Sequence, residues 1–242
     1  WINGRNIKIK GVALHHDGGA VGAAVPLDVW RRRFELLREM GANAIRTAHN
    51  PFSQEFFDLA DEMGFLVMHE VLDAWTVGKN SAEQGYHRDF AEWWSRDTED
   101  AVRRDRNHPS IFIYSAGNEI RDNLDSLEGI MQLQSLLDLY HTLDPSRPVT
   151  MALFRPNQMN VYDNGFADML DVIGQNYREG ELIAAWRQNP QRRVIGTENT
   201  HGREVWLQMR DNPFYSGQFL WTGIDYLGEA DWPAVAWSTA PI

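Results

Sequence analysis

Hydrophobic residues occur along this chain in short runs, and most of these runs are separated by polar segments with helical spacing of apolar residues. A run of four to eight apolar residues bounded by turn residues is typical of a buried strand. Eight segments fit this description: IKIKGVAL (7–14), ANAIRTA (42–48), FLVMHEV (65–71), SIFIYSAG (110–117), RPVTMAL (147–153), LDVIGQNY (170–177), RVIGTEN (193–199) and SGQFLWTG (216–223).

Two of the intervening segments have the periodicity of amphipathic helices. Segment 28–40 spaces its apolar residues by four, three and three positions, at Trp30, Phe34, Leu37 and Met40. Asp28 is suited to cap its N-terminus, and Gly41 to end it. The next helix repeats the design, with Ser53 as its expected N-cap, Gly64 as its stop, and an apolar stripe formed by Phe56, Phe57, Ala60 and Met63.

Longer helices are expected over 89–106 and 124–143, each ahead of a strand. Strands that alternate with helices pair in parallel through crossover helices. Eight such strands predict an α/β fold, a (β/α)8 TIM barrel, as a single domain over residues 1–242. A doubly wound open sheet is the alternative. It would gather its unusual polar residues at one switch point, whereas a barrel carries them at many strand ends.

Polar or aromatic residues come after almost every predicted strand. They are His15 and His16; Arg46 and His49; His69, Glu70 and Asp73; Asn118 and Glu119; Asn176 and Tyr177; Glu198, Asn199 and His201; and Trp221 and Asp225. The opposite ends of the strands are mostly plain turns, such as NHPS and DPSRP. This asymmetry favours the barrel and predicts a site on one face.

The composition of the chain argues against several classes of binding partner and of chemistry. The net charge is −11, from 34 acidic residues against 23 Lys and Arg, so we expect no nucleic acid partner, since phosphate backbones require a basic face. No apolar run approaches the ~20 residues of a membrane span, so we expect no membrane partner. The absence of Cys excludes disulfides, thiolate nucleophiles and Cys-ligated metals. The opening residues WINGRNIKIKG contain neither a starting Met nor a secretory apolar region, so we expect a piece of a longer chain or a processed form.

Two carboxylates are the candidate catalytic pair. Glu119 comes after a buried strand, directly behind Gly117 and an amide, and Glu198 ends the seventh predicted strand. Two acids that face each other across a polar mouth suit glycoside hydrolysis, in which one holds a proton for the leaving oxygen and the other stays ionised. The alternative is that one or both acids pair with nearby arginines. A separation of roughly 5 Å would predict retention, and a wider gap inversion.

Other polar residues admit both a functional and a structural role. Arg46 could keep the strand-seven carboxylate ionised, or be an ordinary buried ion-pair arginine. Tyr177 could support the same carboxylate through its hydroxyl, or be a core tyrosine. His15 and His16 are adjacent, so in a strand they point to opposite faces. We expect no metal site, since no His-Glu-x-x-His spacing occurs.

Several motifs resemble glycoside hydrolase family 2, in its β-galactosidase branch. They are RRDRNHPSIFIYSAGNE, VIGTEN, GVALHH, MGANAIRTAHNP and GQFLWTGIDYLGE. The resemblance runs from about residue 4 to 233 and implies the barrel fold already predicted.

The resemblance also implies a retaining exo-β-glycosidase for terminal β-galactosides. By position, the family's acid/base falls on Glu119 and its nucleophile on Glu198. Asn118 matches the residue that binds the sugar 2-hydroxyl. Glu198 would attack the anomeric carbon while Glu119 protonates the leaving oxygen, and Glu119 would then activate water.

Five further residues match the substrate pocket of the family. His15 and His49 match pocket histidines, and Arg46 matches the arginine that supports the nucleophile. Tyr177 matches the tyrosine beside the nucleophile, and Trp221 the aromatic floor under the sugar.

The sequence departs from the family in two ways. Many relatives have Asp-Glu where this chain has His69-Glu70, and the magnesium-binding Glu-x-His of some members is not matched by VLDAW. We therefore expect no cofactor, with magnesium left as a possibility that its motif does not support. The β-sandwich domains that usually precede the barrel are absent, and we expect them in the parent chain.

The sequence leaves three sugars as alternatives for the substrate: a β-galactoside, a β-glucuronide and a β-mannoside. Relatives acting on β-glucuronides add an Asn-x-Lys after the eighth strand, and residues 222–242 contain no Lys, which disfavours a glucuronide. A β-mannoside is harder to exclude. A different class of function, a non-catalytic carbohydrate-binding barrel fragment, would hold if the pocket needs the absent domains. We expect a periplasmic or secreted location rather than a cytoplasmic one.

Overall fold

Eight parallel strands form a closed barrel in the computed structural model, which describes residues 2–80, 82–155 and 159–224. In chain order they are β1 (Ile9–His15), β2 (Ala44–Ala48), β3 (Leu66–Glu70), β4 (Ile111–Asn118), β5 (Val149–Leu153), β6 (Ile173–Asn176), β7 (Val194–Asn199) and β8 (Tyr215–Leu220). The barrel closes between β1 and β8, which pair from Ile9 with Gly217 to Val12 with Leu220. The predicted TIM barrel is confirmed, and the open sheet is excluded.

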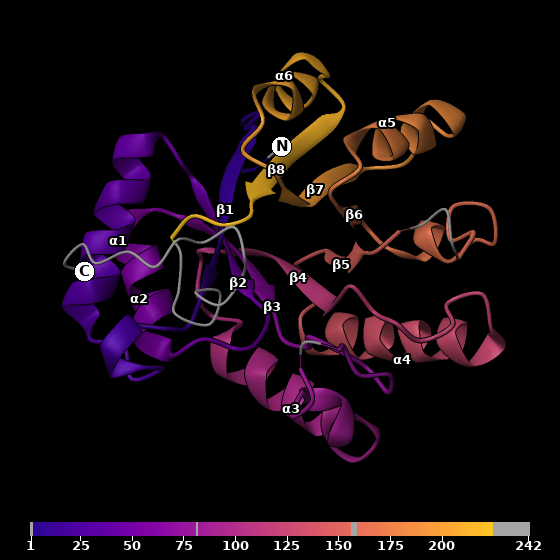
Figure 1. The fold of residues 1–242 in the computed structure, drawn as a ribbon, viewed down its shortest axis with the longest axis horizontal. Coiled ribbons are helices and arrows are strands. Elements are labelled where there is room, and N and C mark those ends of the chain that lie inside the picture. Colours follow the sequence, from indigo (N-terminus) through magenta and orange to yellow (C-terminus); the bar gives the residue numbers. More distant parts are fainter. Residues whose placement is uncertain (1, 81, 156–158, 225–242) are drawn as a thin grey trace.

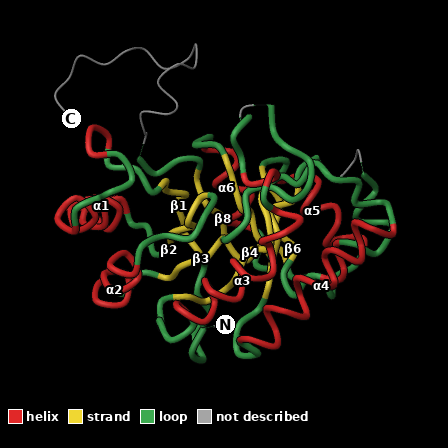
Figure 2. Tube along the Cα trace, turned by 90° about the horizontal axis from the view of Figure 1, so that it is seen from below, coloured by secondary structure: helices red, strands yellow, loops and turns green. Residues whose placement is uncertain are grey.

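Six α-helices of the described residues surround the barrel (Figure 1). They are α1 (Leu27–Met40), α2 (Gln54–Met63), α3 (Phe90–Asp105), α4 (Leu127–Leu143), α5 (Glu179–Gln188) and α6 (Arg203–Asp211). Viewed at right angles, the strands keep the centre, with α1 and α2 on one side and α4 and α5 on the other (Figure 2). None of the helices in the described part of the chain has both the length and the apolar composition needed to cross a membrane.

The two glycine stops agree with the sequence, whereas α4 begins at Leu127 rather than at the expected residue 124. Ser53 occupies the N-cap position of α2, but its side chain makes no capping hydrogen bond. Gly41 and Gly64 end α1 and α2 in the left-handed conformation, with φ of 87° and 72°. The expected N-cap Asp28 is wrong, because α1 begins at Leu27 after Pro26. Proline fixes φ near the value found here, −61°, and it leaves Asp28 in the first turn, where a negative charge still favours the helix dipole.

The large core lies between the helices and the outside of the barrel. It is rich in aromatic rings, among them Trp30, Phe34, Phe56 and Phe57, all fully buried. Burying each such side chain contributes on the order of 2 kcal/mol or more. This core fixes the positions of the strands on which the site depends.

A smaller apolar cluster is formed by strand residues alone: Ile9, Ala44, Met68, Ile113, Ile195 and Phe219. Phe219 packs tightly against Gly11, where an added Cβ would come within 2.3 Å of its ring. Side chains two positions apart on a strand share a face. Arg46, Glu70 and Ser115 each lie two residues after a member of this cluster. The interior therefore changes from apolar to polar toward the C-terminal ends of the strands.

Candidate active site

All eight residues predicted for the site lie within the described residues, in or just after the C-terminal ends of the strands: His15, Arg46, His49, Asn118, Glu119, Tyr177, Glu198 and Trp221. Hydrogen bonds among them and Asn176 connect strands β2, β4, β6 and β7 in one network. The asymmetry seen in the sequence is therefore present in the fold. Asp225, which the sequence also places after the eighth strand, lies outside the described residues.

Arg46 is the centre of this network, and its side chain is fully buried. Its Nη2 atom lies 2.8 Å from both carboxylate oxygens of Glu70. The same Nη2 donates to Asn118 Oδ1 at 2.9 Å, and Nη1 donates to Glu198 Oε1 at 2.9 Å and to the carbonyl of Thr197 at 3.0 Å. One guanidinium thus donates to five acceptor atoms, on two acids, one amide and one backbone carbonyl, whereas an ammonium group has only three N–H donors.

Glu198 is almost completely buried and surrounded by donors. Besides the Arg46 ion pair, it accepts a hydrogen bond from the Tyr177 side chain, and His49 Nε2 lies 3.6 Å from its Oε1. Burial and the negative charge of Glu198 raise the pKa of Tyr177, so its hydroxyl stays protonated and able to donate. Arg46 and Tyr177 thus both direct hydrogen-bond donors at this carboxylate.

Glu119 has a different environment. It is anchored by Asn176, whose Nδ2 donates to Oε1 at 3.2 Å, and its other oxygen lies 3.6 Å from Arg121 Nη2. Burial raises the pKa of Glu119, and the negative charge of Glu198 raises it further. Burial and a neighbouring negative charge therefore favour a proton on Glu119, whereas Glu198 is held by an ion pair and a hydroxyl donor.

Asn118 links the two halves of the site. Its Oδ1 accepts from Arg46 at 2.9 Å and from Asn176 Nδ2 at 3.0 Å, and its Nδ2 donates to Asp73 at 3.3 Å. An unbroken series of hydrogen bonds thus runs from Glu119 through Asn176, Asn118 and Arg46 to Glu198. Such a network fixes the side chains before a ligand arrives.

Aromatic rings form one wall of the mouth. His49 and Trp221 stack with their planes parallel and ring centres 5.2 Å apart, and His15 meets Trp221 edge-on at 4.9 Å. Burial, with the nearby His49 and Arg46, lowers the pKa of His15 to about 3, so its ring is neutral at physiological pH. His49 and Trp221 each adjoin a cis peptide bond, Ala48–His49 and Trp221–Thr222.

Two histidines near strand ends lie outside this site. His16 packs on Trp30 and Phe52, away from His15, as alternation along a strand requires. His69 is fully buried on the outer side of β3, where Nε2 contacts Asp105 at 2.8 Å and the ring stacks on Phe57. Within the described ranges, no group of three His, Asp or Glu side chains is arranged to hold a metal ion.

Three further residues of the site received no role from the sequence. Glu70 is fully buried and binds Arg46, His49 Nδ1 at 2.6 Å and Ser115 Oγ at 2.5 Å. Asp73 accepts from Lys79 Nζ at 2.5 Å, and the side chain of Lys79 is only 11% exposed. The signal that could have identified Glu70 is its place two residues after an inward-facing Met on a strand that adjoins Arg46.

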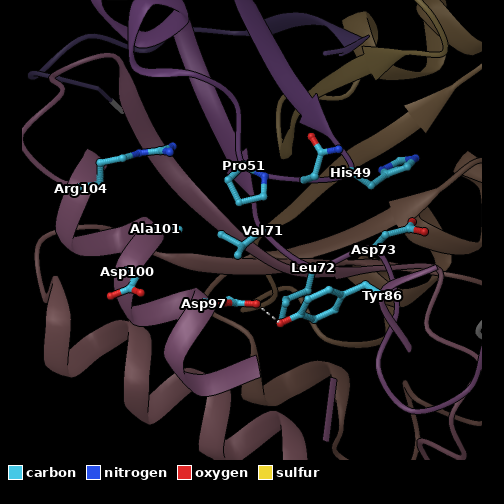
Figure 3. Close-up of a pocket in the computed structure, with 11 residues that line it drawn as sticks. His49, Pro51, Val71, Leu72, Asp73, Tyr86, Asp97, Asp100, Ala101 and Arg104 are labelled. Atoms are coloured by element: carbon cyan, nitrogen blue, oxygen red, sulfur yellow. Dashed lines mark hydrogen bonds between the residues drawn. The ribbon is translucent and has the colours of Figure 1, made fainter. Parts of the chain in front are cut away.

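Two cavities open beside these residues. One of about 330 Å3 is lined by His15, His16, Asp17, Ala48, His49, Asn50 and Asp73. The other, also about 330 Å3, shares His49 and Asp73 and extends to Asp100 and Arg104 of α3 (Figure 3). Tyr86 lines it as well and donates to Asp97 at 2.7 Å. The mouth is therefore hollowed on the side of β1 to β3.

Backbone strain is concentrated at the same place. Glu119 and Tyr177 both have left-handed backbones, with φ of 47° and 55°. Neither is a glycine, so each conformation carries a cost of about 1 kcal/mol or more. Backbone bonds offset this cost, since the Glu119 amide donates to the Ala152 carbonyl at 2.9 Å and the Tyr177 amide to the Glu198 carbonyl at 2.5 Å.

Comparisons with known proteins agree with this geometry. The family described as "Glycosyl hydrolases family 2, TIM barrel domain" matches residues 1–236. A β-galactosidase of Bacteroides ovatus is 35% identical over 314 residues, covering 96% of this chain and 36% of its own length. A β-glucuronidase of Chlorocebus aethiops is 34% identical over 228 residues, covering 88% and 33%.

A solved structure of a family 2 member is also similar to this chain. A family 2 member from Bacteroides cellulosilyticus superposes with a TM-score of 0.84 at 33% identity, covering 91% of this chain and 28% of that one. The present chain thus spans about a third of the length of its relatives.

Proposed function

This chain belongs to glycoside hydrolase family 2, and on that premise we propose that it is the catalytic barrel of a retaining exo-glycosidase that cleaves terminal β-galactosides. One observation carries the proposal: two carboxylates at the same barrel mouth have opposite surroundings. Arg46 forms an ion pair with Glu198 and Tyr177 donates a hydrogen bond to it, whereas burial and the nearby Glu198 raise the pKa of Glu119. Glycoside hydrolysis by a pair of carboxyl groups needs this division of roles, and retention is proposed from the resemblance to the family.

In the first step, Glu198 attacks the anomeric carbon as Glu119 gives its proton to the leaving oxygen. The bond to the leaving group breaks, and a covalent glycosyl–enzyme ester forms. In the second step, Glu119, now ionised, takes a proton from water, and the water oxygen displaces Glu198. Asn118, whose Oδ1 accepts hydrogen bonds from Arg46 and Asn176, is proposed to bind the sugar 2-hydroxyl.

The aromatic wall and the remaining pocket residues support sugar binding. The stacked pair His49 and Trp221 offers a flat apolar surface for a sugar ring, and His15 adds a neutral polar edge. The parent protein is proposed to add β-sandwich domains that complete the pocket, in keeping with the greater length of the relatives.

The reaction is tested in the natural full-length protein with Glu119→Ala and Glu198→Ala variants. Glu198→Ala is expected to lose on the order of 10⁴-fold in kcat for every glycoside. Glu119→Ala is expected to lose roughly 10²- to 10⁴-fold on substrates with poor leaving groups and far less on activated aryl glycosides, which need little protonation. Glu204→Gln, an exposed acid of α6, is the matched control.

Azide separates the two roles further. It should rescue Glu119→Ala as a β-glycosyl azide and Glu198→Ala as an α-glycosyl azide, because it attacks from opposite faces. Proton NMR of the first sugar released by the wild-type protein should detect the β-anomer. Release of the α-anomer would contradict double displacement.

A β-glucuronide is the second candidate substrate, because β-glucuronidases are also among the similar proteins. The galactoside is preferred because the motifs of this chain resemble the β-galactosidase branch, and a β-galactosidase is among the similar proteins. The values of kcat/KM for the chromogenic β-galactoside, β-glucuronide and β-mannoside separate these candidates. The galactoside assignment is abandoned if it is the poorest of the three.

A further inference from the structure

Two arginines stack on one phenylalanine beside Glu119, and this arrangement is not used in the reaction described above. Arg121 Cζ lies 3.8 Å from the centre of the Phe154 ring, and Arg155 Cζ lies 4.8 Å from it. We propose that Arg121 and Arg155 form a subsite for an anionic leaving-group sugar, one that carries a carboxylate or a sulfate ester. This inference rests on the proposed function, because it takes Glu119 as the proton donor to the leaving group.

The topology of the barrel brings these residues together. Strands β4 and β5 are neighbours, and the Glu119 amide donates to the Ala152 carbonyl at 2.9 Å. Arg121 and Phe154 each lie two residues beyond this bond, so the two loops leave the barrel side by side. The arginine pair is therefore built on the rim next to the acid/base.

Among the described residues, the one ion pair made by these two arginines is the long contact of Arg121 with Glu119. Arg121 Nη2 is 3.6 Å from Glu119 Oε2, which is longer than a hydrogen bond, and both arginines are exposed. The neighbouring acid Asp122 accepts hydrogen bonds from the backbone amides of Thr76 and Val77 instead of pairing with these arginines. Two guanidinium groups held against one ring repel each other, and a bound anion would relieve that repulsion.

The position of the pair identifies what it would bind. A proton donor must lie within hydrogen-bond distance of the leaving oxygen, so the leaving-group sugar lies against Glu119. Arg121 lies 3.6 Å from the same carboxyl group, so its guanidinium would lie beside that sugar. Guanidinium groups bind carboxylate and sulfate oxygens through paired hydrogen bonds, and stacking on Phe154 orders them in advance.

A neutral sugar stacked on Phe154 is the competing explanation. The arginines oppose it, because a ring contacted by guanidinium groups offers charge rather than an apolar face to a ligand. In an otherwise acidic chain of net charge −11, an exposed cationic pair at the mouth is also a local reversal of charge.

The test uses the natural full-length protein and three disaccharides with the same cleavable sugar. That sugar is linked to glucose, to glucuronate or to glucose 6-sulfate, and its release gives kcat/KM. We expect one or both charged substrates to be cleaved about 5-fold better than the neutral one at low salt, with the advantage reduced at about 0.5 M NaCl. The charged substrate that is preferred identifies carboxylate or sulfate as the ligand.

Arg155→Gln is the decisive variant, because Arg155 contacts Phe154, whereas Arg121 contacts the acid/base itself. It should remove most of the preference for the charged substrate while leaving kcat/KM for the glucose-linked substrate unchanged. Arg121→Lys should keep part of the preference, and Arg121→Gln should lose it. Arg103→Gln, an exposed arginine of α3 paired with Glu99, is the control.

The outcomes separate this inference from the proposed function. Equal cleavage of neutral and charged substrates, or an Arg155→Gln variant that slows all three alike, overturns the anionic subsite and leaves the glycosidase intact. Failure to cleave any of the three, together with the chromogenic glycosides, overturns the proposed function and the inference with it.

Discussion

Replacing Glu70 by Gln removes one buried charge from the centre of the site while almost preserving its shape. Glu70 is fully buried and accepts hydrogen bonds from Arg46 and Ser115, with His49 Nδ1 at 2.6 Å. Arg46 then retains one carboxylate partner, Glu198. The opposite change, Arg46→Met, leaves both carboxylates buried without their cation. We therefore expect Arg46→Met to be the more destabilising of the two.

The magnitude is set by the pKa of Glu70. Burial disfavours the charged form of this carboxyl, but Arg46 and His49 outweigh burial and lower its pKa from 4.5 to about 2. At about 1.4 kcal/mol per pH unit, the difference corresponds to roughly 3 kcal/mol of folding free energy at neutral pH. This value agrees with the typical cost of breaking a buried ion pair, about 3–5 kcal/mol of folding free energy. We expect about 3 kcal/mol for Glu70→Gln and about 5 kcal/mol for Arg46→Met.

The dependence on pH gives the sharper test. A group whose pKa is lowered by folding stabilises the fold above its unfolded pKa, and this stabilisation is lost as the pH falls through the folded pKa. The difference in unfolding free energy between wild type and Glu70→Gln should therefore be constant above about pH 6 and fall to about half by about pH 3.

Chemical denaturation with tryptophan fluorescence as the readout measures this difference at each pH. The exposed Glu204→Gln serves as a control that should match the wild type. A cost for Glu70→Gln below about 0.5 kcal/mol, or one that does not change between about pH 7 and pH 3, would refute the reasoning. So would an Arg46→Met variant more stable than Glu70→Gln.

Single contacts and backbone positions give three further predictions. Tyr177→Phe removes a donor to Glu198 and should lower kcat about 10-fold or more with little change in stability, as measured by steady-state kinetics and thermal unfolding. Gly64→Ala should destabilise by about 1 kcal/mol, because its φ of 72° suits only glycine, whereas Gly180→Ala, in open space inside α5, should stabilise slightly. Both are compared by denaturation midpoints. Ser126→Ala should cost about 1 kcal/mol by the same measurement, since its hydroxyl accepts from Gly129 at the start of α4.

The strands, the barrel and the face that carries the site could be predicted from the sequence, because they depend on local periodicity and on the residue types just after each strand. Gly41 and Gly64 were readable as helix ends for the same reason. The contact of Arg46 with Glu198 was one of two open interpretations, and the structure contains it. Local patterns could not reveal the second partner, Glu70, since the pairing depends on the distance between two side chains on adjacent strands.

Irregularities in the strands are the second reason that the sequence alone did not predict which side chains face the barrel interior. Ile195 and Glu198 are three residues apart, as are Ser115 and Asn118, so regular alternation would send the members of each pair to opposite faces. Both pairs nevertheless contribute to the interior, because the register shifts between Gly196 and Asn199 and between Ser115 and Asn118. A bulge of this kind re-aims a side chain, and a period of two does not predict it.

Because Glu119 and Tyr177 have left-handed backbones, selection for thermal stability and selection for activity favour different residues at these two positions in directed evolution. Glycine at either position would relieve the conformational cost, so a library screened only for survival at high temperature would select glycine wherever that relief exceeds the value of the lost side-chain contacts. Each such gain would remove the proposed proton donor or the donor to Glu198. Screens that score residual activity after heating should instead keep Glu119 and Tyr177 and find their stabilising changes elsewhere in the barrel.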